Sequence, residues 1–110
     1  MIPAFDALPD ELELNITAQD IGRGKRSDWG ACPIVLAANR ELRTHFQEPV
    51  RTRVHQSLLI FPQDSEFYVG RYWISRTGGK FMERFDMGKR VKPCKIKVYK
   101  PGKGPAWEDS

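Results

Sequence analysis

The sequence has few of the features that mark metal sites, secreted proteins or membrane proteins. Its 110 residues include two cysteines and two histidines, without a CxxC pair or a closely spaced histidine pair, which excludes the common zinc motifs. The longest apolar runs, PIVLAA and SLLIF, are far shorter than the ~20 residues that cross a bilayer. The opening MIPAFDALPDELELNI lacks the basic start and apolar run of a signal peptide. These absences predict a cytoplasmic protein with reduced thiols and no metal or other cofactor.

The charge balance is mildly basic. Eighteen lysines and arginines against 14 acids give a net charge of +4. This charge excludes an acidic mimic of DNA and permits contact with a nucleic acid or with an acidic protein. Hydrophobic residues make up 40% of the chain and charged residues 29%, as in an ordinary globular protein. A chain of this length is expected to form one domain and to bury a core without disulfides.

Two kinds of apolar periodicity predict an α+β domain. Apolar and polar residues alternate over 12–16, which is typical of a half-buried strand. Apolar residues recur at three- and four-residue spacing over 34–46, which predicts a helix that begins near Cys32 with Pro33 in its first turn. By the same criteria we expect three further strands and two short helices, at 53–61, 67–76 and 94–99 and at 18–21 and 80–87.

The resulting order β-α-α-β-β-α-β predicts a small mixed or antiparallel sheet with helices packed on one face. The strands at 53–61 and 67–76 are expected to pair as a hairpin. The predicted organisation is a loosely ordered N-terminal arm over residues 1–11, one domain over 12–100 and a flexible C-terminal tail over 101–110.

Local signals also mark two helix ends. Thr17 followed by Asp20 has the spacing of a capping box. Gly88 is placed to end the last helix in a left-handed conformation. Asp86 lies near the same helix end, where the dipole disfavours an acid, so we expect its carboxylate to bond a loop N–H or an arginine. Rather than acid–base catalysis, we predict a structural role for four acids: Asp20, Asp28, Glu83 and Asp86.

Cys32 raises the question of a reactive thiol. A cysteine at a helix N-terminus can have a lowered pKa, because the helix dipole favours the thiolate. A nucleophilic cysteine also needs a base close by. His45 lies about 20 Å away along an ideal helix, and His55 reaches Cys32 only if its strand folds back beside it. We favour the alternative, in which Cys32 packs the first turn as a small apolar residue and neither bonds Cys94 nor reacts.

Aromatic and basic residues are the most suggestive feature. One predicted strand carries Arg71, Tyr72 and Trp73, although Tyr72 shares a strand face with Ile74 and that row could instead cover the helices. Arginines and aromatic rings on a sheet can stack bases and hold phosphates, and the same residue types anchor protein interfaces. The predicted partner-binding residues, for a protein or a nucleic acid, are Trp29, Arg71, Tyr72, Trp73, Arg76, Lys95 and Lys97.

Two segments resemble a family of small uncharacterised proteins of bacteriophages, prophages and actinobacterial genomes. The first has a D-I-x-x-G…D-x-x-x-C-P-I motif, and the second has an F-x-x-x-F-D-x-G-x-x-V-x-P motif. The matching positions are Thr17, Asp20, Ile21, Asp28, Cys32, Pro33 and Ile34, then Phe81, Phe85, Asp86, Gly88, Val91 and Pro93. The resemblance covers about half of the chain and brings no activity with it. It implies a phage-type accessory protein that binds a host protein, such as a component of an antiviral defence system, in the host cytoplasm.

The leading hypothesis is therefore a non-enzymatic protein that binds another protein through exposed aromatics and arginines. One alternative is a nucleic-acid-binding domain that uses a basic and aromatic sheet face. A second alternative is a cysteine-dependent enzyme or redox sensor that uses Cys32. No membrane partner is expected, and no pattern indicates a particular oligomeric state.

Overall fold

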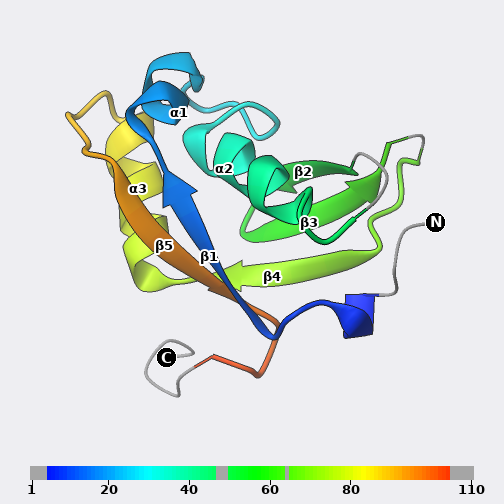
Figure 1. The fold of residues 1–110 in the computed structure, drawn as a ribbon. Coiled ribbons are helices and arrows are strands. Elements are labelled where there is room, and N and C mark those ends of the chain that lie inside the picture. Colours follow the sequence, from blue (N-terminus) through cyan, green and yellow to red (C-terminus); the bar gives the residue numbers. More distant parts are fainter. Residues whose placement is uncertain (1–4, 47–49, 64, 105–110) are drawn as a thin grey trace.

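The computed structural model describes residues 5–46, 50–63 and 65–104. Within them, five antiparallel strands form a sheet in the order β1-β5-β4-β3-β2 (Figure 1). This arrangement confirms the predicted single-domain α+β class. The strands are β1 (Glu11–Ile16), β2 (Val50–Val54), β3 (Ser57–Pro62), β4 (Gly70–Ile74) and β5 (Cys94–Tyr99). The helices are the 3-10 helix η1 (Phe5–Ala7) and the α-helices α1 (Ala18–Arg23), α2 (Pro33–Leu42) and α3 (Arg76–Asp86).

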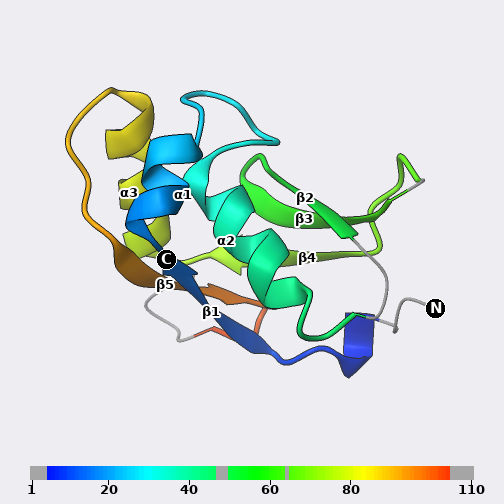
Figure 2. The same ribbon diagram turned by 45° about the horizontal axis from the view of Figure 1, so that its top comes forward.

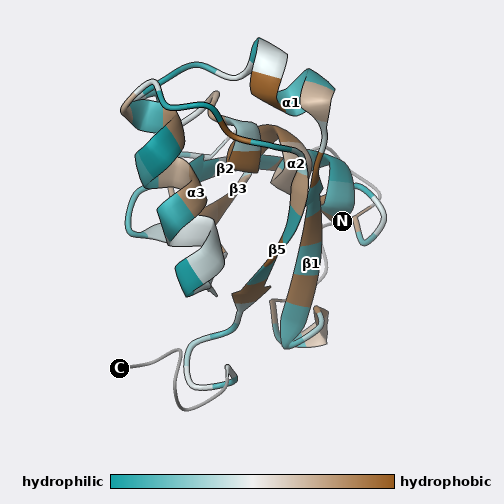
Figure 3. Cartoon of the chain, turned by 90° about the vertical axis from the view of Figure 1, so that its left-hand side faces the viewer, coloured by the Kyte–Doolittle hydropathy of each residue, from teal (hydrophilic) through white to brown (hydrophobic). Residues whose placement is uncertain are grey.

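The sheet curls around α2, which contacts both of its edge strands, β1 and β2 (Figures 1 and 2). Alternate residues of each strand face this helix, and Leu14, Ile60 and Tyr72 among them are completely buried. The alternation is visible as polar and apolar bands along β1 (Figure 3). On the helix, the apolar stripe predicted from the spacing is buried against the same core. The opposite row of each strand is therefore available for other contacts.

The structure has one strand more than the sequence predicts. The segment predicted as one strand over 53–61 is two strands, β2 and β3, because the chain reverses at Gln56. The N–H of His55 donates to the carbonyl oxygen of Ser57 at 3.0 Å and closes this turn. The turn contains none of the glycine, proline or asparagine residues that mark tight hairpins, so composition gives no sign of it.

Residues 5–10, predicted as part of a loosely ordered arm, pack against the sheet. The hydroxyl of Tyr72 donates to the carbonyl oxygen of Pro9 at 2.7 Å, and the rings of Phe5 and Tyr72 meet edge-on at 5.3 Å. The ammonium of the buried Lys100 donates to the carbonyl oxygen of Leu8 at 2.7 Å. The domain thus extends to residue 5. The rest of the predicted arm, 1–4, and most of the predicted tail, 105–110, lie outside the described residues.

Helix α3 begins four residues earlier than predicted. Ser75 caps it, and the Ser75 hydroxyl accepts the N–H of Gly78 at 3.2 Å. Gly78 and Gly79 therefore lie inside the helix. A Cβ at Gly78 would lie 2.6 Å from Cγ2 of Ile74 and 3.0 Å from Cδ1 of Ile96. The absence of a side chain lets α3 approach β4 and β5 closely.

Substitutions of these two neighbouring glycines are expected to have opposite effects on stability. Gly78→Ala should lower the free energy of unfolding by about 1–3 kcal/mol, because the new methyl group overpacks Ile74 and Ile96. A Cβ at Gly79 meets nothing within 4 Å. Gly79→Ala should therefore raise the free energy of unfolding by about 0.5–1 kcal/mol through its higher helix propensity. Urea unfolding of the two variants measures the difference, and equal effects would contradict the close packing of α3.

The end of α3 is tied to the loop that follows α1. Gly88 has φ +77° and ends the helix in the predicted left-handed conformation. The carboxylate of Asp86 accepts the N–H of Ser27 at 2.9 Å, which confirms the prediction that Asp86 bonds a loop N–H. This contact spans 59 residues of sequence and helps to position the loop that carries Trp29.

Candidate functional site

The face of the sheet turned away from α2 carries arginine and aromatic side chains. In the strand register, Arg51 of β2 is opposite Phe61 of β3. Arg53 of β2 and Arg71 of β4 lie on either side of Leu59, two residues along β3 from Phe61. Trp73 of β4 is in the same row, because it is two residues from Arg71. We define the arginine–aromatic face as Arg51, Arg53, Phe61, Arg71 and Trp73 together with Tyr68 of the loop before β4.

Phe61 is the centre of this face. The guanidinium carbons of Arg51 and Arg53 lie 5.7 and 5.5 Å from its ring centroid. The ring of Tyr68 meets the Phe61 ring edge-on, with centroids 6.3 Å apart. These neighbours leave Phe61 only 8% exposed, although it is not part of the main hydrophobic cluster. Each such cation–π contact contributes about 0.5–1 kcal/mol, so the two guanidinium groups are held over the sheet.

The loop before β4 presents large apolar side chains to solvent. Arg51 donates to the carbonyl oxygen of Ser65 at 2.6 Å, and the N–H of Phe67 donates to the Ser65 hydroxyl at 3.0 Å. The loop is fixed by these bonds, yet Phe67 is 82% exposed and Tyr68 is 53% exposed. Neighbouring apolar side chains left in water are typical of an interaction surface, whereas isolated ones are not.

Positive charge is balanced on one half of the sheet and unbalanced on the other. Lys95 and Lys97 of β5 are each 3.8 Å from a glutamate of β1, Glu13 and Glu11 respectively. Within residues 5–46, 50–63 and 65–104, no carboxylate forms an ion pair with Arg53 or Arg71. The arginine–aromatic face therefore presents a net positive potential, which favours an acidic partner.

Trp29 lies beside this face, over the turn between β2 and β3. Its carbonyl oxygen accepts the N–H of Val54 at 2.9 Å, and its indole stacks on the imidazole of His55 with centroids 4.5 Å apart. The indole is nevertheless 58% exposed. A cavity of about 450 Å³ opens here, and Arg53 joins it to the arginine–aromatic face. The lining residues of this Trp29 pocket are Ser27, Asp28, Trp29, Gly30 and Arg53.

The prediction that Tyr72 contacts a partner is wrong. Tyr72 is completely buried, and its hydroxyl is bonded to Pro9. Burial, together with the negative charge of Asp10, raises the pKa of the Tyr72 hydroxyl to about 12. Its neighbours Arg71 and Trp73 point the opposite way and are exposed, as strand alternation requires.

The structure also gives the positions of Arg76, of the loop before β4 and of two arginines of β2. Arg76 is exposed in the first turn of α3, outside the sheet. The sequence pattern starts a strand at Phe67, but β4 begins at Gly70, so Phe67 and Tyr68 belong to the exposed loop. The place of Arg51 and Arg53 around Phe61 depends on the register of β2 with β3, which the sequence pattern does not reveal.

Cys32 is packed and not presented to solvent. It precedes α2 as the N-cap residue and is 3% exposed. Burial raises the pKa of its thiol and outweighs the N–H groups of the helix start, against the lowering that the dipole alone would give. Cys94 is also a free thiol and is half-buried. His55, which the sequence leaves as a possible base for Cys32, stacks on Trp29.

We expect Cys32 to react slowly with iodoacetamide at neutral pH. The buried, protonated thiol is a poor nucleophile and is hard to reach. The rate is measured by mass spectrometry on a Cys94→Ser variant, and the same variant unfolded in urea gives the reference rate of an accessible cysteine. Reaction of the folded protein at the reference rate or faster would restore the hypothesis of a cysteine enzyme or redox sensor.

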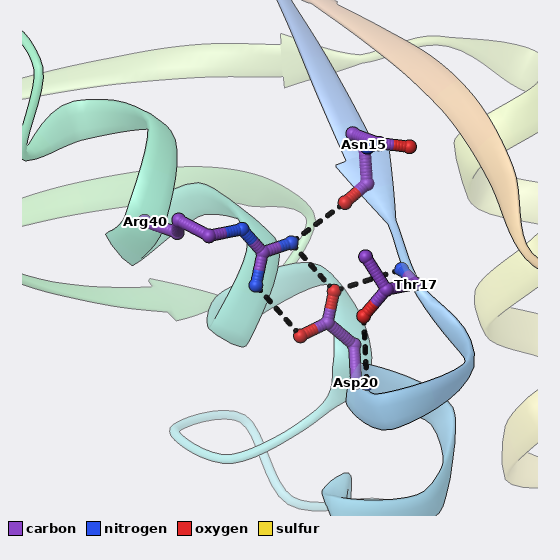
Figure 4. Close-up of polar contacts among 4 residues, drawn as sticks. All are labelled: Asn15, Thr17, Asp20 and Arg40. Carbon is purple, nitrogen blue, oxygen red and sulfur yellow. Dashed lines mark hydrogen bonds and ion pairs between the residues drawn. The ribbon is translucent and has the colours of Figure 1, made fainter.

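Asp20 and Arg40 connect β1, α1 and α2 (Figure 4). The Asp20 carboxylate accepts the N–H of Thr17 at 2.9 Å, while the Thr17 hydroxyl accepts the N–H of Asp20 at 3.1 Å, which confirms the predicted capping box. Arg40 donates to both carboxylate oxygens of Asp20, at 3.0 and 2.7 Å, and to the carbonyl oxygen of Asn15 at 2.7 Å. Burial alone would raise the pKa of Asp20, but the bonds from Arg40 and Thr17 and the charge of Arg40 lower it.

Asp20→Asn is expected to lower the free energy of unfolding by about 1–3 kcal/mol at neutral pH, because charge-assisted bonds to a buried group are lost. The folded pKa of Asp20 is below its unfolded value, so this stability is present above the unfolded pKa and is lost as pH falls through the folded pKa. Urea unfolding at neutral pH and near pH 3 measures the difference between variant and wild type. Glu13→Gln, at an exposed position, is the control, and a difference for Asp20→Asn that does not shrink in acid would contradict the ionised network.

Two further properties bear on the kind of site. Within the described ranges, no group of three or more histidine, cysteine, aspartate or glutamate side chains is placed to hold a metal ion. None of the helices described is long and apolar enough to cross a membrane. A scan against protein-family models and searches of curated proteins and of solved structures find no match to this chain. The resemblance to phage proteins stays a prediction, and the geometry is what supports a function.

Proposed function

We propose that this chain is a non-enzymatic binding protein whose arginine–aromatic face and Trp29 pocket contact another protein with an acidic surface. The observation that carries the proposal is the grouping of exposed aromatic side chains around arginines that lack acidic partners within the described residues. Tryptophan, tyrosine and arginine are the residue types that dominate binding energy at protein interfaces. The exposed aromatic members of the group are Trp29, Phe67, Tyr68 and Trp73.

The arrangement suits an interface because its parts are already fixed. Phe61 holds two guanidinium groups over the sheet, and Ser65 holds the loop that presents Phe67. Side chains that are ordered before binding lose less conformational entropy when the partner arrives. Arg53 and Arg71 supply positive charge between the exposed rings, so carboxylates of a partner would pair with them while apolar side chains cover the rings.

The resemblance to phage and prophage proteins supports a host protein as the partner. A phage-type accessory protein would act in the host cytoplasm by occupying a surface that the host protein needs, such as a surface of a component of an antiviral defence system. Binding without chemistry is sufficient for such a role.

Nucleic-acid binding is the second candidate, favoured by the arginines that flank Trp73 and Phe61. Single-stranded nucleic acids stack bases on aromatic rings and pair phosphates with arginines. Two observations favour a protein instead. Tyr72 is in the core and cannot stack a base, and the lysines of β5 are close to glutamates of β1.

The test is capture from a bacterial lysate on the immobilised protein, with and without nuclease, followed by mass spectrometry. We expect one protein to be retained in stoichiometric amount after nuclease treatment. Trp73→Ala should abolish the capture, and Lys95→Gln, which changes a charge on the balanced half of the sheet, should retain it. Recovery of nucleic acid, with every bound protein lost after nuclease, would assign the face to nucleic acid instead.

A further inference from the structure

A second pocket, of about 210 Å³, lies between α1 and α2, on the helical side of the sheet. None of its residues belongs to the arginine–aromatic face or to the Trp29 pocket. Apart from Leu36, its lining is polar and comes from one side of each helix. The polar lining residues are Gln19, Asp20, Arg23, Asn39, Arg40 and Arg43.

Most of the side-chain acceptors of this pocket already accept hydrogen bonds. Asp20 is the one acidic residue among those that line the pocket. Both oxygens of the Asp20 carboxylate accept hydrogen bonds from Arg40. The side-chain oxygen of Asn39 accepts the hydroxyl of Thr52 at 2.8 Å. Among the side chains of the lining, this leaves chiefly the amide oxygen of Gln19 as an acceptor for a cation or for a donor group of a ligand.

Several donor groups, in contrast, have no partner within the protein. In the part of the chain that the structure describes, the guanidinium groups of Arg23 and Arg43 have no hydrogen-bond or ion-pair partner, and neither has the side-chain nitrogen of Asn39. Three guanidinium groups against one carboxylate leave two positive charges in a small space. Arg40 is held in place by Asp20 and Asn15, so one wall of the pocket is rigid before any ligand enters.

We propose that this pocket binds a phosphate group, as the free ion or as a phosphate monoester. The dianion of a monoester presents only acceptor oxygens, and the dianion of the free ion keeps a single P–OH donor. The charge of either dianion matches the two uncompensated positive charges. Guanidinium groups bind oxyanions through parallel N–H donors, which is why arginine is preferred at phosphate sites. The amide nitrogens of Asn39 and Gln19 add neutral donors on the two helices.

The simplest alternative is that Arg23 and Arg43 only complement the helix dipoles, since Arg23 ends α1 and Arg43 follows α2. That role requires no ligand and predicts no saturable site. It also predicts the same response to any anion at equal ionic strength, because screening depends on ionic strength and not on the shape of the anion.

The experiment is an NMR titration of the backbone amides of α1 and α2 with inorganic phosphate, and separately with ribose 5-phosphate, at constant ionic strength set by chloride. We expect saturable shifts with both probes. Tighter binding of ribose 5-phosphate assigns the pocket to a monoester, and equal or weaker binding assigns it to the free ion. Arg43→Gln should weaken binding by about tenfold or more, because a charged hydrogen bond is lost.

Arg71→Gln, on the opposite side of the sheet, is the matched control and should leave the phosphate affinity unchanged. Arg23→Gln provides a second variant at an exposed position, and it should also weaken binding. Shifts that do not saturate, that chloride reproduces or that survive both pocket substitutions would overturn the proposal. Because no residue is shared with the arginine–aromatic face, this result is independent of the capture experiment.

Discussion

Replacing Tyr72 by alanine is expected to lower the free energy of unfolding by about 3–5 kcal/mol, the range found for large aromatic residues in cores. The ring is completely buried in the core, and the rings of Phe5 and Tyr72 meet edge-on. The substitution also removes the donor to the carbonyl oxygen of Pro9, so it should loosen the segment that precedes β1. Urea unfolding measures the loss.

Tyr72→Phe separates packing from hydrogen bonding in the same position. It should cost only about 1 kcal/mol, because the ring remains and one hydrogen bond is lost. Partner capture by Tyr72→Phe should equal that of the wild type, because the hydroxyl faces the core and Pro9. Loss of capture by this stable variant would contradict the assignment of Tyr72 to the core.

Trp29→Ala is expected to weaken binding of the captured protein by about 30-fold or more, as for residues that cost at least 2 kcal/mol at interface centres. The indole is exposed, borders the pocket and is already oriented by His55. The bond from Val54 to the Trp29 carbonyl oxygen involves only backbone atoms and remains in the variant. Isothermal titration calorimetry with the purified partner measures the change.

Met87 supplies the control for this experiment, since it is 62% exposed at the end of α3 and is outside the proposed contact surface. Met87→Ala should leave the affinity unchanged. Equal losses for Trp29→Ala and Met87→Ala would show that exposed apolar residues matter without regard to place, which would contradict the assigned contact surface.

Local signals in the sequence predict several parts of this fold correctly. The bounds of β5 follow from strict alternation of apolar residues with lysines. The capping box at Thr17 and the end of α3 at Gly88 depend on residues within a few positions, so their chemistry is visible in the sequence. Asp86 is a further case, because an acid at the wrong end of a helix dipole indicates a specific partner.

The parts that sequence patterns miss depend on distant residues. Phe5 and Pro9 are ordered by Tyr72, which is more than 60 residues away along the chain. The turn at Gln56 is stabilised by the pairing of two strands and not by a turn residue. The sequence does not show whether Tyr72 faces the core or solvent, because its row of the strand contains both aromatic and apolar residues. The register with β3 places it opposite Leu58, on the side of the sheet that faces the core.

The sequence also reveals some residues of the candidate site and not others. Residue types alone indicate Trp29, Arg71 and Trp73 as contact residues, since exposed tryptophan and arginine are typical of interfaces. The sequence gives no sign that Arg51 and Arg53 converge on Phe61, because that contact requires β2 and β3 to be paired in one register. Nor does it show that a glutamate of β1 lies beside each lysine of β5.

The most direct test of the contact surface is hydroxyl-radical footprinting of the protein alone and bound to the captured partner, read by mass spectrometry. This method reports the solvent exposure of individual side chains. If the arginine–aromatic face and the Trp29 pocket are the contact surface, Trp29, Phe67 and Trp73 should become protected while Met87 stays reactive. Protection of Met87 with unchanged reactivity of Trp29, Phe67 and Trp73 would contradict it.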